Sequence, residues 1–355
     1  MCHHGATLVK SIPSPPVGGT LVACVAENSE GWYQEVQNLV LSLRRFGGEL
    51  SAAPFVACFV EGVEPRFASG LAALDAEVRV VDRVDARNPP SNKLRMLELV
   101  ATHDFDMLLA IDTDTVVVGD VGRYAVPGAV AVKPENTDPY PAATWRGVFA
   151  DLGIPEPGRS IVTTSTAEVT YPYYNSGVVF VPRALCGTLR EAWAKRVADV
   201  LDLYTRRPDI VAPPQRHWTN QLALALALVG DGIPVAPLPV AGNLSTTVRV
   251  HPLFAHQVTP PFVLHYHNEI DGQGFVFRSR NAVLNPLIDA VNRARAEAFG
   301  LAYDGLPSPP LVRRALREVE GRGWYERGPV ATVRRHRLLA PVRRRAKRLA
   351  KGAGG

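Results

Sequence analysis

The sequence predicts an α/β protein with a mostly parallel central sheet and helices on both of its faces. Apolar runs typical of strands alternate with helical patterns through the first 135 residues, and this alternation is typical of parallel sheets. The chain has 355 residues, of which 46% are hydrophobic. It is therefore long enough to bury a large core.

Strands and helices are expected in a regular order. Residues 21–26 form a short apolar strand, a polar turn follows over 27–31, and the next apolar residues recur at helical spacing until Gly47 and Gly48. The later elements are a strand over 55–60, a helix over 67–74, a strand over 78–82, a helix over 92–102 and a strand over 107–111. Since ligands bind at the carboxyl ends of parallel strands, the turn at 27–31 and the residues after 111 should line one edge of the sheet.

Two carboxylates stand one residue apart at the end of the strand over 107–111. Asp112 and Asp114 flank Thr113, and a second apolar run begins at Thr115. Mn²⁺ and Mg²⁺ prefer oxygen ligands and take few carboxylates, which leaves room for substrate phosphate oxygens. On an extended chain both acids would point to one face and reach one ion. The alternative is a solvated turn, because short acidic motifs often occur by chance.

Several classes of protein do not fit the chain. Neither Gly-x-Gly-x-x-Gly after the first strand nor Gly-x-x-x-x-Gly-Lys-Ser/Thr is present, which argues against a dinucleotide site and a P-loop. Residues 1–16 lack the apolar core of a signal peptide, and no apolar run reaches the roughly 18 residues of a membrane span, so we expect a cytoplasmic protein. Four scattered cysteines indicate neither a disulfide framework nor a zinc site.

Basic residues concentrate at the C-terminus. Residues 311–355 contain 14 Lys and Arg against 3 Asp and Glu, whereas residues 1–310 contain 25 against 31. Such a segment could contact the anionic inner face of a membrane, and a solvated tail is the alternative. We expect a flexible N-terminus over 1–19, one folded domain over 20–305 and a basic, helical or partly disordered tail over 306–355. No nucleic-acid-binding motif is present.

Further segments follow in a recognisable order and spacing. They are Asn92-Lys93-Leu94-Arg95, the acidic segment 112–120, the segment 174–180 with Asn175-Ser176-Gly177, the pair Asn220-Gln221, and His265. Together they resemble the family 8 glycosyltransferases of the GT-A fold, the glycogenin-like and lipopolysaccharide galactosyltransferase-like enzymes, over roughly residues 20–270. The resemblance implies a GT-A fold and metal-dependent, retaining transfer of a sugar from a nucleotide-diphosphate sugar, UDP-sugar being favoured, to an unknown acceptor.

The resemblance also implies roles for individual residues. Asp112, Asp114 and His265 would hold Mn²⁺ or Mg²⁺ against the diphosphate, with Lys93 as a further phosphate or sugar contact. The catalytic residues at the transferred sugar would be Asn175, Asn220 and Gln221, and Ser176 and Gly177 would lie beside them. The remaining donor contacts would be Ala26, Glu27, Asn28, Tyr33, Asp82 and Thr113, with the turn at 27–29, Tyr33 and Asp82 near the nucleobase. The alternatives are a surface role for Lys93, a tight turn at 175–177 and a core aromatic at Tyr33.

Two departures from the family pattern leave other functions open. Asn220 stands where many members have Asp, and residues 265–272 lack the lysine of the usual His-x-x-Gly-x-x-Lys-Pro-Trp. His267, Arg278 or Arg280 could replace that lysine. His267 would also share a strand face with His265, which makes it a rival metal ligand. A catalytically degenerate sugar-nucleotide-binding protein and a nucleotidyltransferase are therefore the alternatives.

Two proline-containing segments are expected on the acceptor side. Residues 134–172 show little periodicity apart from a helical piece over 145–152, and residues 213–218 form a second such segment. Long irregular segments inside a compact domain are often lids or binding loops. We therefore expect both to cover the acceptor.

Overall fold

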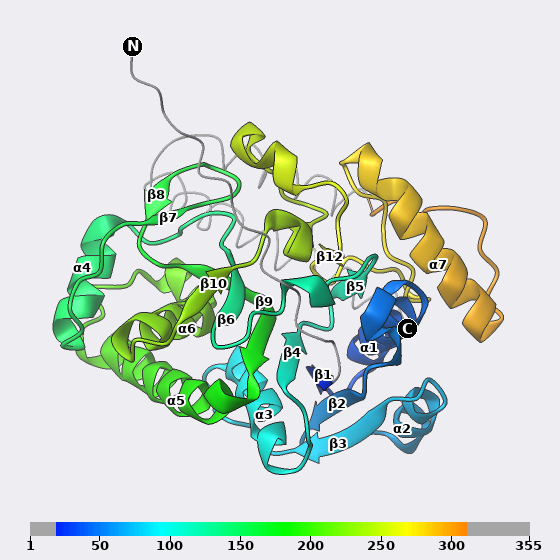
Figure 1. Ribbon diagram of the computed structural model, residues 1–355, viewed down its shortest axis with the longest axis horizontal. Helices are drawn as coiled ribbons and strands as arrows, with labels where there is room; N and C mark the ends of the chain where they lie inside the picture. The colour runs from blue at the N-terminus through cyan, green and yellow to red at the C-terminus, as the bar shows by residue number, and fades with distance from the viewer. Residues whose placement is uncertain (1–18, 311–355) are drawn as a thin grey trace.

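A central sheet of seven strands organises the part of the protein that the structure describes (Figure 1). The computed structural model describes residues 19–310. The strand order is β10-β6-β9-β4-β1-β2-β3, and the neighbouring pairs are parallel except for the two that include β9. The predicted α/β class with a mostly parallel sheet is confirmed. The strands are β1 (Thr20–Glu27), β2 (Phe55–Val60), β3 (Glu77–Val81), β4 (Met107–Ile111), β6 (Val130–Pro134), β9 (Tyr174–Pro182) and β10 (Val235–Pro237).

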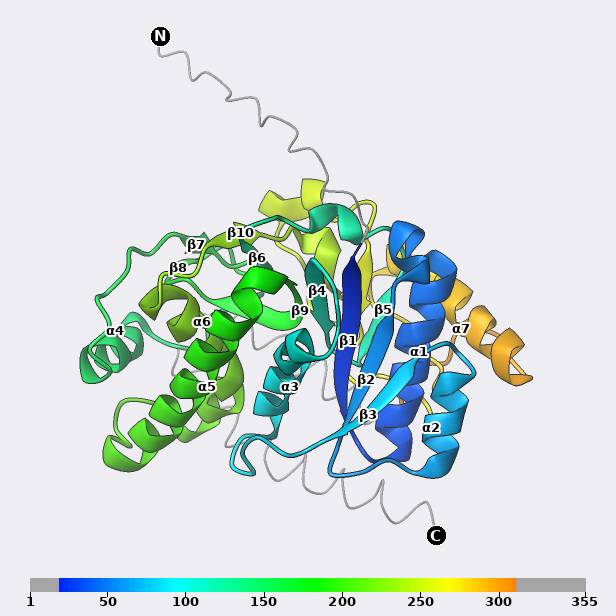
Figure 2. The same ribbon diagram turned by 60° about the horizontal axis from the view of Figure 1, so that its bottom comes forward.

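Helices cover both faces of this sheet. Figure 2 shows α1 and α2 on one side of β1, with α3, α5 and α6 on the other. Each face has its own apolar core, because α1 and α2 contribute residues such as Leu39 and Leu71 to one cluster, whereas α3 and α5 contribute residues such as Leu97 and Trp193 to another. The helices are α1 (Glu30–Phe46), α2 (Pro65–Ala72), α3 (Leu94–Leu97), α4 (Ala142–Asp151), α5 (Arg183–Arg206), α6 (Thr219–Gly230) and α7 (Asn285–Phe299).

A smaller sheet lies beside the end of β4. It contains β5 (Thr115–Val117), β11 (Leu244–Ser245) and β12 (Val263–His265), with β12 in the middle. β12 runs antiparallel to β5, and His265 is the register partner of Thr115. This pairing brings the region around residue 265 next to the acidic segment that follows β4.

The element positions expected from the sequence are largely confirmed. β2 and β4 have the expected bounds, and β1, α1, α2 and β3 differ from expectation by a few residues at their ends. The helix expected over 92–102 is instead three short pieces, a 3₁₀ turn Pro89–Lys93, α3 and a 3₁₀ turn Glu98–Ala101. Two prolines open the first piece, where their fixed φ favours a tight turn.

The segment 134–172 is more ordered than expected. It contains α4 and a small hairpin of β7 (Ile161–Val162) and β8 (Val169–Thr170). Trp145 and Phe149 of α4 are buried in an apolar cluster with Leu203 of α5 and Leu226 of α6. The expected helical piece is confirmed as α4, most of the remaining segment has no regular secondary structure, and aromatic residues at helical spacing give it a core of its own.

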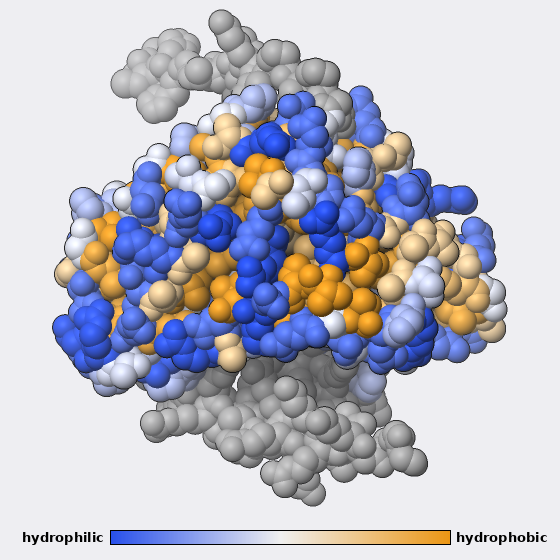
Figure 3. Space-filling model, turned by 90° about the horizontal axis from the view of Figure 1, so that it is seen from below, coloured by the Kyte–Doolittle hydropathy of each residue, from blue (hydrophilic) through white to orange (hydrophobic). Residues whose placement is uncertain are grey.

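The cysteines, the surface and the chain ends remain to be described. Cys24, Cys58 and Cys186 are buried and unbridged. Within residues 19–310, no helix is both long enough and apolar enough to cross a membrane. From below, apolar side chains gather as a patch among hydrophilic ones (Figure 3). Cys2, most of the expected N-terminal segment and the basic residues 311–355 lie outside the described residues.

Candidate active site

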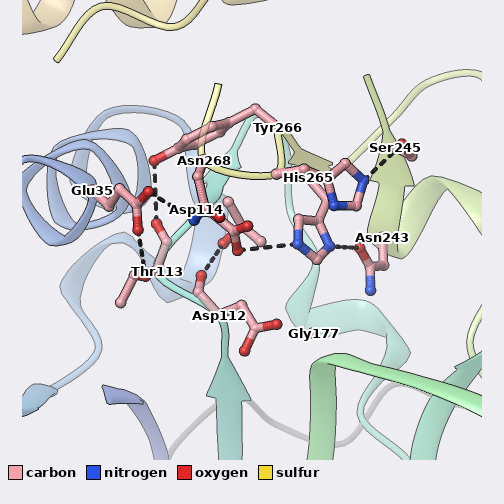
Figure 4. A network of polar contacts seen from close by, with 12 residues as sticks. Glu35, Asp112, Thr113, Asp114, Gly177, Asn243, Ser245, His265, Tyr266 and Asn268 are labelled. Atoms are coloured by element: carbon pink, nitrogen blue, oxygen red, sulfur yellow. Dashed lines mark hydrogen bonds and ion pairs between the residues drawn. The ribbon is translucent and has the colours of Figure 1, made fainter. Parts of the chain in front are cut away.

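The acidic segment after β4 is a tight turn. Thr115 opens β5, and its hydroxyl donates to the Asp112 carbonyl at 2.6 Å. Side chains alternate between faces only on an extended chain, so the argument from alternation does not apply to Asp112 and Asp114. In Figure 4 the carboxylates of Asp112 and Asp114 project in different directions, and that of Asp114 faces His265.

Asp114, His265 and His267 form a cluster that could hold a metal ion. One potential ligand atom from each lies within 4.8 Å of the others. His265 Nε2 is 3.0 Å from Asp114 Oδ1, and the two imidazole rings stack with their centroids 4.1 Å apart. A carboxylate with two imidazoles suits a first-row divalent ion such as Mn²⁺. The rival ligand His267 thus belongs to the cluster, whereas Asp112 lies outside it.

The ion pair in this cluster affects the protonation of both partners. Burial alone would raise the pKa of Asp114, but the neighbouring His265 brings that pKa well below its usual value. Burial likewise disfavours a charged imidazole, yet the Asp114 carboxylate raises the pKa of His265. A metal ligand must offer the lone pair that a proton would otherwise take. A metal ion and a proton would therefore compete for His265.

Lys93 bridges the acidic turn and the beginning of β9. Its Nζ lies 2.5 Å from Asp112 Oδ1 and 3.1 Å from both the carbonyl and the hydroxyl oxygen of Ser176. The side chains of Lys93 and Asp112 are 13% and 21% exposed. The alternative of a solvated surface lysine is therefore wrong, since the amine is held between two elements of the candidate site.

Asn175 and Gly177 lie on β9 next to the end of β4. The Asp112 amide donates to the Gly177 carbonyl at 2.8 Å, and the Gly177 amide donates to Asn175 Oδ1 at 2.8 Å. A Cβ on Gly177 would lie 2.8 Å from His265 Cε1. A glycine is thus required by the close approach of the imidazole. The segment belongs to β9, which begins at Tyr174, and is not an isolated turn.

Asn220 and Gln221 lie in the first turn of α6. Asn220 is 4% exposed, and neither polar atom of its amide has a hydrogen-bond partner among the described residues. Gln221 Oε1 accepts a hydrogen bond at 3.3 Å from the hydroxyl of Tyr173. Tyr173 stands two residues before Asn175 in the chain. Buried polar groups are normally paired, so the amide of Asn220 is suited to a ligand.

Glu27, at the carboxyl end of β1, is engaged by an arginine. Arg83 donates from Nη1 and Nη2 to the two oxygens of Glu27, each at 2.8 Å, and also pairs with Glu61 at 3.0 Å. Asn92 donates to Glu27 Oε1 at 3.3 Å. Ala26 is buried beside Glu27 within β1. Glu27 is therefore linked through Asn92 to the segment that carries Lys93.

The other residues expected at the nucleobase surround this end of the sheet. Asn28 Oδ1 accepts from the Glu64 amide at 3.1 Å, and Asp82 is exposed immediately after β3. The Tyr33 ring stacks on Phe67 with centroids 4.2 Å apart. Tyr33 thus packs against the protein, which was the alternative to base stacking. Its neighbour Trp32 is 36% exposed.

Glu35 of α1 is a buried carboxylate that the motifs did not reveal. It accepts from Thr113 Oγ1 at 2.8 Å and from Asn268 Nδ2 at 2.9 Å (Figure 4). Burial, reinforced by Asp114, raises its pKa to about 7. Glu35 connects the acidic turn to the loop after β12. A carboxylate four residues before Leu39, on the apolar stripe of the helix, is the sequence signal that could have identified it.

Two residues near β11 contact the histidines and were also not predicted. Asn243 Oδ1 lies 3.2 Å from His265 Nδ1, and Ser245 Oγ lies 2.8 Å from His267 Nε2. Of the candidates for the missing lysine, Arg278 and Arg280 are exposed. No sequence motif surrounds Asn243 or Ser245, so their contacts become visible only once β11 pairs with β12.

The arrangement can bind a divalent cation together with an anionic, hydroxylated ligand. The carboxylate and imidazoles supply ligands for a cation, and Lys93 supplies a positive charge beside them. The amides of Asn175, Asn220 and Gln221 can donate to and accept from hydroxyl groups. These groups lie on segments that the sheet brings to one edge, as expected for an α/β fold.

The family model described as Rhodobacterales glycosyltransferase domain matches residues 22–232, more than half of the chain. Sequence comparison with curated proteins gave no match. The solved structures that are similar to this chain include three glycosyltransferases. GlyE of Streptococcus pneumoniae TIGR4 is 16% identical with a TM-score of 0.45, and the match covers 79% of this chain and 63% of GlyE. An active-site mutant of LgtC is 14% identical with a TM-score of 0.48, and the match covers 79% of this chain and 95% of LgtC. Mouse xyloside xylosyltransferase 1 in its apo form is 12% identical with a TM-score of 0.44, and the match covers 69% of this chain and 96% of that chain.

This chain spans 63% of the length of GlyE. The family match includes the acidic turn, β9 and the start of α6, and it ends before Asn243 and the two histidines.

Proposed function

Since this chain belongs to the Rhodobacterales glycosyltransferase domain family, we propose that it transfers a sugar from a nucleotide-diphosphate sugar in a metal-dependent reaction. The observation that carries the proposal is the cluster of Asp114, His265 and His267 beside the Lys93–Asp112 ion pair. This places cation ligands and a positively charged amine next to each other, which is what a diphosphate requires.

The metal proposed is Mn²⁺ or Mg²⁺, and Asp114 and His265 would hold it. His267 is a third candidate ligand because it lies in the same cluster. Asp112 pairs with Lys93 through Oδ1 at 2.5 Å and would contribute its other carboxylate oxygen. When bound, such an ion neutralises charge on the diphosphate leaving group. Two imidazoles favour Mn²⁺ over Mg²⁺, which prefers oxygen ligands.

The donor phosphates would lie against Lys93. Its amine is mostly buried and is already held by an anionic oxygen of Asp112. A phosphate oxygen can take the place of that carboxylate oxygen, because both are anionic hydrogen-bond acceptors. Ser176 contacts Lys93 and would complete the contact together with the backbone of Thr113, which follows Asp112.

The transferred sugar would contact Asn175, Asn220 and Gln221. The unpartnered, buried amide of Asn220 supports this assignment, because a sugar hydroxyl can satisfy both of its polar atoms. With an amide rather than a carboxylate at this position, we propose retention by departure of the diphosphate and attack from the same face. Gln221 would then act as a dipole near the developing positive charge.

The nucleotide would lie at the carboxyl ends of β1 and β3, with a uridine nucleotide favoured. Glu27, Asn28 and Asp82 supply acceptors suited to a base N–H or a ribose hydroxyl. Because Tyr33 stacks on Phe67, Trp32 is the more accessible aromatic for stacking. Arg83, which the sequence did not single out, is a further candidate through its contact with Glu27.

We propose a cytoplasmic enzyme whose basic segment 306–355 contacts the inner face of the membrane. The excess of Lys and Arg over residues 311–355 supports this proposal, since basic segments are attracted to anionic lipids. A membrane-associated acceptor would then meet the enzyme more often, and its chemical class stays open.

Thermal unfolding with UDP, GDP, CMP and dTDP sugars, in Mn²⁺ and in EDTA, tests the proposal. A ligand that binds only the folded protein raises its melting temperature. We expect the melting temperature to rise with the sugars of one nucleotide, and only when the metal is present. The enzyme should also hydrolyse that donor slowly. Binding without hydrolysis or transfer would favour the degenerate binding protein. Turnover of a triphosphate with release of pyrophosphate would favour a nucleotidyltransferase, and no response to any donor would contradict the proposal.

A further inference from the structure

Asn243 connects the two halves of the candidate site. It ends the 3₁₀ turn Val240–Asn243, directly before β11, and it is 2% exposed. Its amide oxygen lies 3.2 Å from His265 Nδ1, and its amide nitrogen donates to Asn175 Oδ1 at 2.8 Å. One buried side chain thus contacts both a candidate metal ligand and a candidate sugar contact. Figure 4 shows the His265 ring between Asn243 and Asp114.

The direction of every bond in this chain follows from one backbone group. The Gly177 amide can only donate, and it donates to the side chain of Asn175 at 2.8 Å, so Asn175 presents its oxygen. Asn243 must then direct its nitrogen toward that oxygen, which leaves its own oxygen facing His265. An acceptor there requires a proton on Nδ1 of the imidazole.

A proton on Nδ1 leaves Nε2 as the nitrogen for a metal bond when His265 is neutral. Nε2 is the nitrogen that faces Asp114, at 3.0 Å. Imidazole ligands generally donate their other N–H to a protein acceptor, which fixes the tautomer and the ring orientation. We propose that Asn243 is a positioning residue that fixes the Nδ1–H tautomer of His265 and couples it to Asn175. This inference rests on the proposed function.

The chemistry of the amide explains why asparagine is required. An aspartate could still accept from His265 Nδ1–H, but its second oxygen would face Asn175 Oδ1, and neither oxygen could donate. A leucine of similar size could make neither contact and would leave the buried oxygen of Asn175 with one donor fewer. Asn243→Asp therefore removes only the contact to Asn175, whereas Asn243→Leu removes the contacts to both Asn175 and His265.

Mn²⁺ binding without donor, followed by electron paramagnetic resonance of free Mn²⁺, tests the histidine contact. We expect Asn243→Leu to weaken Mn²⁺ binding about 10- to 100-fold, the usual effect of losing such a partner. Asn243→Asp should keep Mn²⁺ affinity within a few-fold and lower kcat for donor hydrolysis at least about tenfold, with a smaller change in KM. Unchanged Mn²⁺ affinity in folded Asn243→Leu, or unchanged kcat in Asn243→Asp, would overturn the inference.

A second buried asparagine serves as the matched control. Asn292 of α7 is 1% exposed, accepts from the Val276 amide and donates to the Val276 carbonyl, both at 2.9 Å. Asn292→Leu and Asn292→Asp make the same chemical changes in a pair that includes no candidate ligand. Both should lower the melting temperature without altering Mn²⁺ affinity or kcat. A loss of Mn²⁺ affinity in Asn292→Leu equal to that of Asn243→Leu would show that both act only through stability.

The tautomer can also be read without any metal. In the neutral ring, ¹⁵N chemical shifts distinguish the protonated from the unprotonated nitrogen. At alkaline pH we expect the Nδ1–H form of His265 in the wild type and a mixture in Asn243→Leu, while an Nε2–H form in the wild type would refute the inference. If the wild type binds no Mn²⁺ but shows the Nδ1–H form, the metal-dependent function fails and the positioning by Asn243 still holds.

Discussion

The Lys93 ammonium lies 2.5 Å from Asp112 Oδ1, and its second partner is Ser176 on β9. One carboxylate of the acidic turn is thus neutralised by a lysine of the preceding segment, while the other, Asp114, pairs with His265. The two acids of one short motif therefore have different partners. Asp112 belongs to the lysine side of the site and Asp114 to the histidine side.

Replacing Lys93 tests this division. In Lys93→Met we expect donor affinity to fall at least about tenfold, because a charge-assisted contact to phosphate contributes about 1.5–3 kcal/mol. Mn²⁺ affinity without donor should rise, since Asp112 loses its cation. Isothermal titration with each ligand measures both effects. Lys195→Met is the control, because Lys195 pairs with Asp199 on α5. An unchanged donor affinity would remove Lys93 from the site.

Single substitutions of the two acids should differ. Asp114→Asn is expected to abolish the metal-dependent rise in melting temperature, because Asp114 lies in the ligand cluster. Asp112→Asn should weaken metal binding less, since its carboxylate lies outside that cluster. Circular dichroism checks that both variants keep the fold. A larger loss in Asp112→Asn than in Asp114→Asn would contradict the assignment of the histidine side as the metal side.

Gly177 should not tolerate a side chain. An added Cβ would lie 2.8 Å from His265 Cε1 and 2.9 Å from Asn175 Oδ1, so Gly177→Ala must displace one of them. We expect kcat to fall at least about tenfold, together with a loss of stability of about 1–3 kcal/mol. Gly187→Ala on α5 is the control, because its Cβ meets nothing within 4 Å. That variant should gain up to about 1 kcal/mol and keep full activity.

Lys133 predicts how stability depends on pH. It is 1% exposed, and burial lowers its pKa to about 8 from the ordinary 10.5 despite Glu135 nearby. Between these two values the unfolded chain binds more protons than the folded one, so the unfolding free energy contributed by Lys133 rises with pH. This gain in unfolding free energy is lost as the pH falls from 10.5 through about 8, the pKa of Lys133 in the folded protein.

Chemical denaturation of wild type and Lys133→Met over this range measures the effect. Between pH 8 and 10.5 the unfolding free energy of the wild type should rise by up to about 3 kcal/mol relative to that of Lys133→Met. Lys195→Met, at a side chain that is 60% exposed, should show no such trend. Parallel pH curves for wild type and Lys133→Met would show that the Lys133 amine titrates normally.

A strand was predictable from the sequence where an apolar run has turn residues at both ends. β2 and β4 are such runs, since each is buried along its whole length and is bounded by polar, proline or glycine-containing segments. The direction of β9 was not predictable, because hydrophobicity does not distinguish a parallel from an antiparallel strand. That direction is nevertheless what brings Asn175 beside the end of β4.

The candidate site was predictable for residues within motifs and less so for their partners. Asp114 lies beside His265, and Lys93 lies beside Asp112, but the separation of Asp112 from the cluster depends on the turn at residues 112–114. The inclusion of His267 depends on a left-handed backbone at φ 53, which few residues other than glycine adopt readily. Asn243 contacts the site through tertiary packing, for which a single sequence carries no local signal, whereas Glu35 has a weak signal in its place on the apolar stripe of α1.

The register of β12 against β5 has a consequence for how the chain can vary in length. His265 is opposite Thr115, and a slip by one residue would present Leu264 or Tyr266 there and turn the side chains to the opposite face. A slip by two residues would require His267, which now follows the end of β12 with a left-handed backbone, to become extended. Insertions or deletions that shift β12 are therefore expected to remove the imidazole from beside Asp114.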